Sequence, residues 1–284
     1  MTQLRSILQR PISIQNDTSI SHAIFRLLQG DISRLIVKGD SSDGIVTEKD
    51  IGLFLFTDES KERLDEIPIS KITKRLTSVH ENMTPQNTAQ IMMDKDIGSV
   101  GVHSNTDGLI GIVTKTDLVK YYFKNFVGHK RVGDLMTISY TSMESESPLN
   151  KVVSKMITEK ISRIFLKNQK NEPEGIMTFR DLFQLSLKQG SSGIVLDNSD
   201  PAVSIVFPRK GFLSESGFGQ TTLAKEVMSK NIVSVDYNDD VIMACSAMIE
   251  NKINGVGVKI NDEISGVLSK SDIIKTIPQI KEED

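Results

Sequence analysis

The chain has 284 residues and a formal charge of −3, so it is long enough for one or two domains with buried cores and too acidic overall to coat nucleic acid by bulk charge. Its single cysteine excludes an internal disulfide framework and fits a reducing compartment. No apolar run approaches the roughly 20 residues of a membrane-spanning helix, and the start has no signal-peptide core. We therefore expect a cytoplasmic protein without a membrane segment.

In chain order, one pattern of predicted elements recurs four times: strand, helix, strand, polar turn, strand and helix. The first helix of each copy has apolar residues at helical spacing, as at Ile20, Ala23, Ile24 and Leu27. Each copy opens with a short strand-forming block, and the four blocks align without a gap through the helix to the second strand. The blocks are Ile12–Ile14, Thr77–Val79, Thr141–Met143 and Val233–Val235.

Each copy then carries a motif of glycine, two apolar residues, a hydroxyl residue, two variable residues and aspartate. The four motifs are Gly44–Asp50, Gly111–Asp117, Gly175–Asp181 and Gly266–Asp272. The glycine and the apolar pair predict a buried strand, and the apolar-rich segment after the aspartate predicts a helix. The hydroxyl residue therefore lies where a helix N-cap belongs, with the aspartate three positions later.

The spacing of the motifs predicts the domain organisation. Successive motif aspartates are 67, 64 and 91 positions apart, so an insertion lies between the third and fourth copies. We expect two modules of consecutive repeats, 1–126 and 127–284, because pairing buries sheet faces that one repeat leaves open. The insertion at 188–222 has the signals of a hairpin, either an edge decoration or a lid or partner-binding arm. The expected repeats are 1–65, 66–126, 127–187 and 223–284.

The motif has two interpretations. As a capping box, the hydroxyl and the aspartate only satisfy N–H groups at the helix start. As a ligand site, the helix start and the hydroxyl attract a phosphate, and the aspartate accepts hydrogen bonds from a ribose diol. Just before the second strand, copies one and three have Arg34 and Arg163, where copies two and four have Ser99 and Gly255. An arginine recurring there indicates either a bidentate phosphate contact or an ordinary ion pair.

These residues resemble the CBS domain, named after cystathionine β-synthase, whose tandem pairs are called Bateman modules. The resemblance covers all but the insertion and the tails, and it implies an α/β fold of four β-α-β-β-α repeats paired into two Bateman modules. It further implies roles for the motif residues in adenosine binding. The ribose candidates are Asp50, Asp117, Asp181 and Asp272. The phosphate-side candidates are Thr47, Thr114, Thr178, Ser269, Arg34 and Arg163. The adenine-side candidates are Thr77 and Thr141.

The copies depart from one another in ways that bear on binding. Ile12 and Val233 replace the adenine-side threonine in copies one and four, so these slots offer fewer hydrogen bonds. Gly101 and Gly257 either admit a base beside the sheet or permit close packing. We therefore expect fewer than four bound ligands.

By resemblance, we expect a non-enzymatic regulatory protein that binds AMP, ADP or ATP and signals to a separate partner. S-adenosylmethionine is a further candidate ligand, no metal is required, and a homodimer is allowed. The four histidines show no metal-ligand spacing, and Cys245 falls on the inward face of a predicted helix.

The segment 120–131 leaves an alternative open. It interleaves Lys120, Lys124, Lys130 and Arg131 with aromatic residues, a pattern that can bind single-stranded RNA. The same pattern fits a packed helix with its rings inward and its lysines outward. The alternative function is an RNA- or ribosome-associated protein in which the nucleotide is a gating or structural ligand.

Overall fold

The computed structural model describes residues 3–39, 42–58, 62–106, 108–183 and 221–280. Contacts between residues divide the chain into two compact units, which we call unit 1 and unit 2. Unit 1 consists of Met1–Pro11, Leu76–Tyr140 and Ile232–Asp284. Unit 2 consists of Ile12–Arg75 and Thr141–Asn231. Repeats two and four therefore lie in unit 1, and repeats one and three in unit 2.

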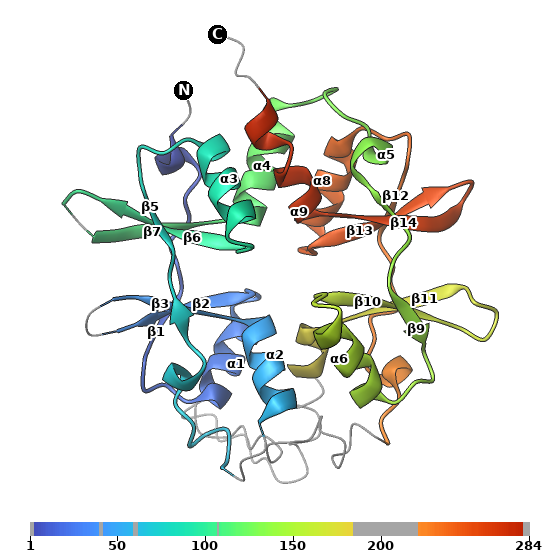
Figure 1. Cartoon of the computed structure of the whole chain (residues 1–284), viewed down its shortest axis with the longest axis horizontal. Helices are drawn as coiled ribbons and strands as arrows, with labels where there is room; N and C mark the ends of the chain where they lie inside the picture. Colours follow the sequence, from blue (N-terminus) through green and yellow to red (C-terminus); the bar gives the residue numbers. More distant parts are fainter. Residues whose placement is uncertain (1–2, 40–41, 59–61, 107, 184–220, 281–284) are drawn as a thin grey trace. The chain divides into compact units, whose positions relative to one another are not determined.

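The two repeats of unit 1 have the predicted order of elements (Figure 1). Repeat two consists of β5 (Ser78–His80), α3 (Pro85–Asp94), β6 (Ser99–Ser104), β7 (Gly108–Thr114) and α4 (Lys115–Asn125). Repeat four consists of β12 (Ser234–Asp236), α8 (Val241–Glu250), β13 (Gly255–Ile260), β14 (Glu263–Ser269) and α9 (Lys270–Ile274). In each, the first strand pairs parallel with the second, and the second pairs antiparallel with the third.

The repeats of unit 2 have the same topology. Repeat one consists of β1 (Ser13–Gln15), α1 (Ile20–Gln29), β2 (Arg34–Lys38), β3 (Gly44–Thr47) and α2 (Glu48–Thr57). Repeat three consists of β9 (Ser142–Glu144), α6 (Leu149–Thr158), β10 (Arg163–Lys167), β11 (Pro173–Thr178) and a helical turn over 179–183. The shorter elements of the chain are η1 (Leu4–Ser6), η2 (Ile69–Lys71), α5 (Val132–Leu135), η5 (Ala224–Glu226) and η6 (Ile277–Gln279).

The segment before each repeat adds to the sheet of its neighbour in the sequence. β4 (Lys74–Arg75), which leads into repeat two, pairs with β3 of repeat one. β8 (Thr137–Ile138), which leads into repeat three, pairs with β14 of repeat four. Single bridges between Gln9 and Ile112 and between Ile176 and Ser229 repeat the pattern. Repeats one and two, and likewise three and four, thus exchange edge segments.

Each unit has its own hydrophobic core, and in Figure 1 the helices of a unit lie between its two sheets. In unit 2 the apolar stripe of α1 is buried as predicted, at Ile20, Ala23, Ile24 and Leu27. In unit 1, α4 packs against both α8 and α9 of the other repeat. Because the helices of the two repeats pack against each other, both repeats of a unit contribute apolar side chains to a shared core.

The predicted four-repeat α/β fold is confirmed. The two units group repeat one with three and repeat two with four, whereas the predicted modules 1–126 and 127–284 group consecutive repeats; these modules stay a prediction. The predicted hairpin in the insertion lies almost wholly at 184–220, outside the described residues. No helix in the described ranges is long and apolar enough to cross a membrane.

Candidate ligand-binding corners of the four repeats

Each motif forms a corner, by which we mean the four residues from its hydroxyl residue to its aspartate, where a strand ends and a helix begins. The hydroxyl donates a hydrogen bond to Oδ2 of the aspartate at 2.6 Å in Thr47–Asp50, 2.7 Å in Thr114–Asp117, 2.8 Å in Thr178–Asp181 and 2.5 Å in Ser269–Asp272. The backbone N–H of the hydroxyl residue donates to the same oxygen. The capping interpretation is therefore confirmed, and it uses one carboxylate oxygen.

The other carboxylate oxygen, Oδ1, distinguishes the four corners. It pairs with Lys74 in Asp50 and with Lys275 in Asp272, and in Asp181 it accepts a hydrogen bond of 3.2 Å from Ser229. Oδ1 of Asp117 has no hydrogen bond or ion pair with any described residue. It is also absent from the fully enclosed polar atoms that lack a partner, so it keeps contact with solvent although Asp117 is only 4 % exposed. The corner of repeat two thus keeps an acceptor oxygen that no described residue uses.

Strand register places the predicted arginines beside the predicted phosphate-side hydroxyls. Arg34 lies opposite Thr47 across β2 and β3, and Arg163 lies opposite Thr178 across β10 and β11. In unit 1 the equivalent partners of the hydroxyl residues are small, Ser99 opposite Thr114 and Gly255 opposite Ser269. The guanidinium of Arg34 also donates to the Ser33 hydroxyl at 3.1 Å. In every repeat, the residue that starts the second strand therefore lies beside the motif hydroxyl at the same end of the sheet.

The upstream blocks start at the same end of the sheets. The carbonyl of Thr77 accepts from the N–H of Gly101 at 2.8 Å, and that of Thr141 accepts from Phe165 at 3.1 Å. The hydroxyl of Thr141 donates to Glu159 at 2.6 Å, and this bond lowers the pKa of the Glu159 carboxyl. The hydroxyl of Thr77 has no hydrogen-bond partner in the described part of the chain. Of the two adenine-side candidates, Thr77 is thus the one with a hydroxyl still available.

The two variable positions of the motif join the repeats of a unit, and this was missed from the sequence. In unit 1, Lys115 donates to the hydroxyl of Ser271 at 2.8 Å, and Lys270 donates to that of Thr116 at 2.9 Å. In unit 2, Arg180 of repeat three donates to Glu48 of repeat one at 2.7 Å. The signal was present as opposite charges or lysine–hydroxyl pairs at these positions, but no single repeat reveals it.

Arg180 is the most connected of these side chains. Besides Glu48 it contacts the carboxylate of Asp31 and donates to the carbonyl of Ile32 at 2.9 Å. Burial raises the pKa of the Glu48 carboxyl, and the charge and hydrogen bond of Arg180 oppose that rise. Burial likewise raises the pKa of Asp181, against hydrogen bonds from Thr178 and Ser229. In the corner of repeat three, burial therefore disfavours the ionised form of the Asp181 carboxyl.

Packing decides several open interpretations. A β-carbon at Gly101 would lie 2.8 Å from side-chain atoms of Leu76 and Leu109, so this glycine permits close packing. Tyr121 and Tyr122 of the 120–131 segment are buried, as the packed-helix interpretation predicts, and cannot stack on RNA bases, whereas Phe123 is exposed and departs from it. Cys245 is buried as expected, and burial raises the pKa of its thiol to about 12.

Two further features of the described residues bear on other kinds of site. No group of three or more His, Cys, Asp or Glu side chains among them could hold a metal ion. A cavity of about 330 Å³ lies between α2 and α6, lined by Phe56, Lys151, Lys155 and neighbouring polar residues. It contains none of the predicted site residues, so the corners and this cavity are separate features.

Four β-α-β-β-α repeats with capped aspartate corners define a tandem-repeat α/β protein, and comparison with known proteins gives its family. The model of the CBS domain matches residues 4–54, 66–124, 132–188 and 224–279. The chain therefore belongs to the CBS domain family, as the sequence predicted.

Individual relatives are distant. The chain is 21 % identical over 276 residues to the uncharacterized protein MJ1404 of Methanocaldococcus jannaschii, and the match covers 95 % of this chain but 60 % of that relative. Among solved structures, it resembles protein MJ1225 of the same organism, a candidate archaeal homolog of g-AMPK, with 16 % identity and a TM-score of 0.79 over 96 % of this chain and 99 % of that one. An uncharacterized conserved protein of Pyrococcus horikoshii gives a TM-score of 0.61 at 16 % identity, over 97 % and 100 % of the two chains. These structures support the fold.

Proposed function

We propose that this chain is a non-enzymatic regulatory protein that binds an adenine nucleotide, AMP, ADP or ATP, and that the corner of repeat two is its principal site. The observation that carries this proposal is the open Oδ1 of Asp117, a buried carboxylate already oriented by Thr114. A ribose diol supplies two O–H donors, which suit an acceptor held in place by its other oxygen. Thr77 lies at the same end of the sheet, and its hydroxyl can form a hydrogen bond with the adenine base.

The other corners rank below it for physical reasons. Lys74 and Lys275, which pair with Asp50 and Asp272, have side chains 69 % and 60 % exposed, and such ion pairs contribute only about 0.2–1 kcal/mol. A ligand can displace them at modest cost. Asp181 is less favourable, because Ser229 occupies its Oδ1 and burial raises its pKa. We therefore infer one strong site and up to two weaker ones.

The phosphate side of the proposal rests on the strand register. Thr47 and Thr178 each have an arginine opposite them, and an arginine can bind a phosphate through two parallel hydrogen bonds. In repeat two the equivalent residue is Ser99, which cannot bind a phosphate as an arginine does. S-adenosylmethionine, an adenosine ligand without phosphate, therefore belongs in the same test. Binding would regulate a separate partner only as far as the ligand prefers one arrangement of the chain over another.

Isothermal titration calorimetry of the whole chain with AMP, ADP, ATP and S-adenosylmethionine tests the proposal. We expect binding in the micromolar range for at least one of them. Asp117→Ala should weaken that binding at least about tenfold, since it removes charge-assisted hydrogen bonds worth about 1.5–3 kcal/mol. Asp181→Ala, which removes the same cap in the other unit, is the matched control and should leave the strongest site intact. The absence of heat with all four ligands would reject the proposal.

A further inference from the structure

The outer face of α4 and the loop after it form a positive surface on an acidic chain. Residues 118–133 include four lysines or arginines and no acidic residue. Lys120, Lys124, Lys130 and Arg131 are all exposed, and none forms an ion pair within the described ranges. Elsewhere in the described ranges some lysines and arginines are paired, as Lys38 is with Asp43 and Lys225 with Glu146, and others, such as Lys95 and Lys170, are not.

Carboxylates also lie near this surface. Asp117 precedes Lys120 by three residues on α4 and is only 4 % exposed. Three others accept hydrogen bonds from backbone N–H groups. Asp134 accepts from the N–H of Arg131 at 2.9 Å. Asp240 caps α8 through the N–H of Ile242 and also accepts from Gly128 at 2.6 Å. Asp239 accepts from the N–H of Asp236 at 2.9 Å. These hydrogen bonds do not neutralise the carboxylates, but within the described ranges none of them forms an ion pair with Lys120, Lys124, Lys130 or Arg131.

Large apolar side chains stand among these cations. Phe123 and Lys124 follow Lys120 on the solvent side of α4 at helical spacing, and Val127 lies in the loop just after the helix ends at Asn125. The loop then runs beside the start of α8, where the N–H of Val241 donates to the carbonyl of Lys130 at 3.0 Å. Met243 lies on the first turn of that helix. The side chains of Val127, Met243 and Phe123 are 68 %, 53 % and 37 % exposed. We call Lys120, Phe123, Lys124, Val127, Lys130 and Met243 the α4 surface.

We infer that the α4 surface binds an acidic segment of a protein partner that also carries large apolar side chains. Charge complementarity requires acidic residues opposite the three cations of the α4 surface, Lys120, Lys124 and Lys130. The exposed Val127 and Met243 gain from contact with apolar side chains, which a nucleic-acid backbone does not supply. Tyr121 and Tyr122 are buried, so Phe123 is the one exposed ring of α4 and offers single-stranded RNA no run of stacking platforms. This inference does not depend on nucleotide binding at the corners.

Selection from a phage library of random 12-residue peptides tests the inference on the whole chain. The library is panned on the wild-type protein after depletion on Phe123→Ser/Val127→Ser, whose substituted side chains are exposed and leave the core intact. We expect enriched peptides to combine acidic with large apolar residues. Enrichment of peptides without an acidic excess, or no enrichment beyond the depleted library, would overturn the inference.

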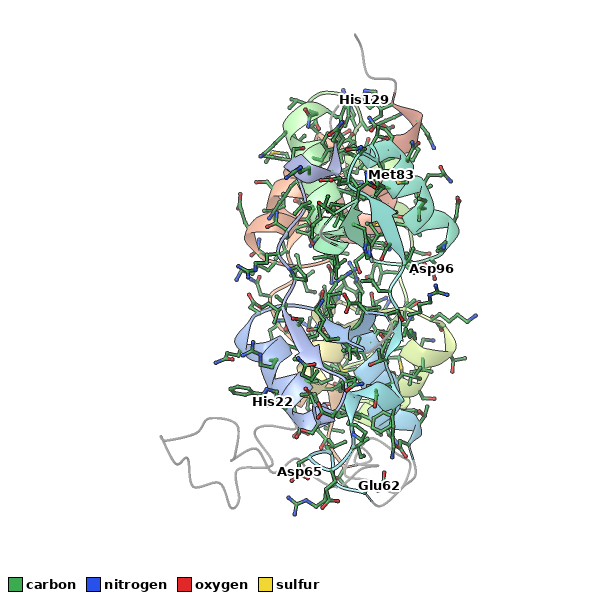
Figure 2. All side chains as sticks on the ribbon, turned by 90° about the vertical axis from the view of Figure 1, so that its left-hand side faces the viewer. His22, Glu62, Asp65, Met83, Asp96 and His129 are labelled. Atoms are coloured by element: carbon green, nitrogen blue, oxygen red, sulfur yellow. The ribbon has the colours of Figure 1, made fainter. Side chains whose placement is uncertain are left out.

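A synthetic copy of the enriched peptide then measures the contributions by fluorescence anisotropy. Lys120→Glu/Lys124→Glu should weaken its binding at least about tenfold, and the apolar double variant at least about fivefold. The matched control is Lys95→Glu/Lys170→Glu, which makes the same charge change at exposed lysines elsewhere. Lys95 adjoins Asp96, and Figure 2 shows Asp96 well apart from His129, which lies in the loop after α4. The control should bind within about twofold of wild type.

Other occupants are excluded by parallel measurements. Co-sedimentation with anionic phosphatidylserine vesicles, a gel shift with polyuridine RNA and sedimentation velocity of the chain alone are each repeated with Lys120→Glu/Lys124→Glu. The inference would be overturned if no peptide is selected and the wild-type protein binds vesicles, RNA or a second copy in a way that this variant does not. The surface would then be assigned to that occupant.

Discussion

The ammonium group of Lys115 lies 2.8 Å from the hydroxyl of Ser271, and the equivalent pair Lys270 and Thr116 is joined at 2.9 Å. Each lysine occupies the first variable position of one motif, and each hydroxyl the second variable position of the other. The two corners of unit 1 are therefore tied to each other through the residues between their capping groups. A displacement of one corner would therefore bear directly on the other repeat of unit 1.

The first prediction concerns these two bonds. Thr116→Val with Ser271→Ala removes the acceptor of each lysine, and Lys270 is only 4 % exposed. We expect the free energy of unfolding, measured by urea denaturation, to fall by about 1–2 kcal/mol. Thr106→Ala, in the turn between β6 and β7, is the control and should change it by less than about 0.5 kcal/mol. An equal effect of both variants would show that the bonds contribute nothing to the pairing.

In unit 2, Arg180 has the equivalent role through Glu48, Asp31 and Ile32. Arg180→Met leaves Glu48, whose side chain is 15 % exposed, without its cation. We expect a loss of about 2–3 kcal/mol in urea denaturation, below the range for fully buried pairs because Arg180 is 28 % exposed. Arg63→Met, which breaks an exposed pair with Asp65, should cost less than about 1 kcal/mol. Adding Glu48→Gln to Arg180→Met should recover part of the loss, and no recovery would contradict this account.

The raised pKa of Glu48 predicts a pH dependence of stability. Below its ordinary pKa of 4.5, Glu48 is protonated in both states and contributes no slope. As pH rises from 4.5 through the folded-state pKa, the folded protein retains a proton that the unfolded chain has released, so the free energy of unfolding falls. Glu48→Gln cannot titrate. The stability of the wild type minus that of this variant should therefore decrease between pH 4.5 and 7, and a difference that grows with pH would contradict the prediction.

A glycine in α2 predicts an unusual response to alanine. In a helix interior, Gly→Ala normally stabilises by about 1 kcal/mol. A β-carbon at Gly52 would overlap Cδ1 of Phe179 in the other repeat of unit 2. We expect Gly52→Ala to lower the free energy of unfolding, measured by urea denaturation, by about 1–3 kcal/mol, because the buried ring of Phe179 has to move. In a Phe179→Leu background the same substitution should cost less, and stabilisation by Gly52→Ala alone would show that the ring yields freely.

The local structure of each repeat could be predicted from the sequence. The four repeats, the strand-to-helix corners and the burial of the α1 stripe follow from patterns within a few residues, because a capping box joins groups three positions apart and a helix buries one face. The structure confirmed the caps at Asp50, Asp117, Asp181 and Asp272 for this reason.

Tertiary packing decided which repeats share a core and how their corners meet. Ser229 reaches Asp181 across 48 positions, and Lys115 reaches Ser271 across 156. Such partners depend on how whole repeats meet, and no periodicity within one repeat encodes that. In the described part of the chain no donor reaches the second oxygen of Asp117, although Lys120 follows it by three residues, as Lys275 follows Asp272 and pairs with it. Side-chain contacts in the folded chain, which the nearly identical motifs do not reveal, therefore distinguish the four aspartates.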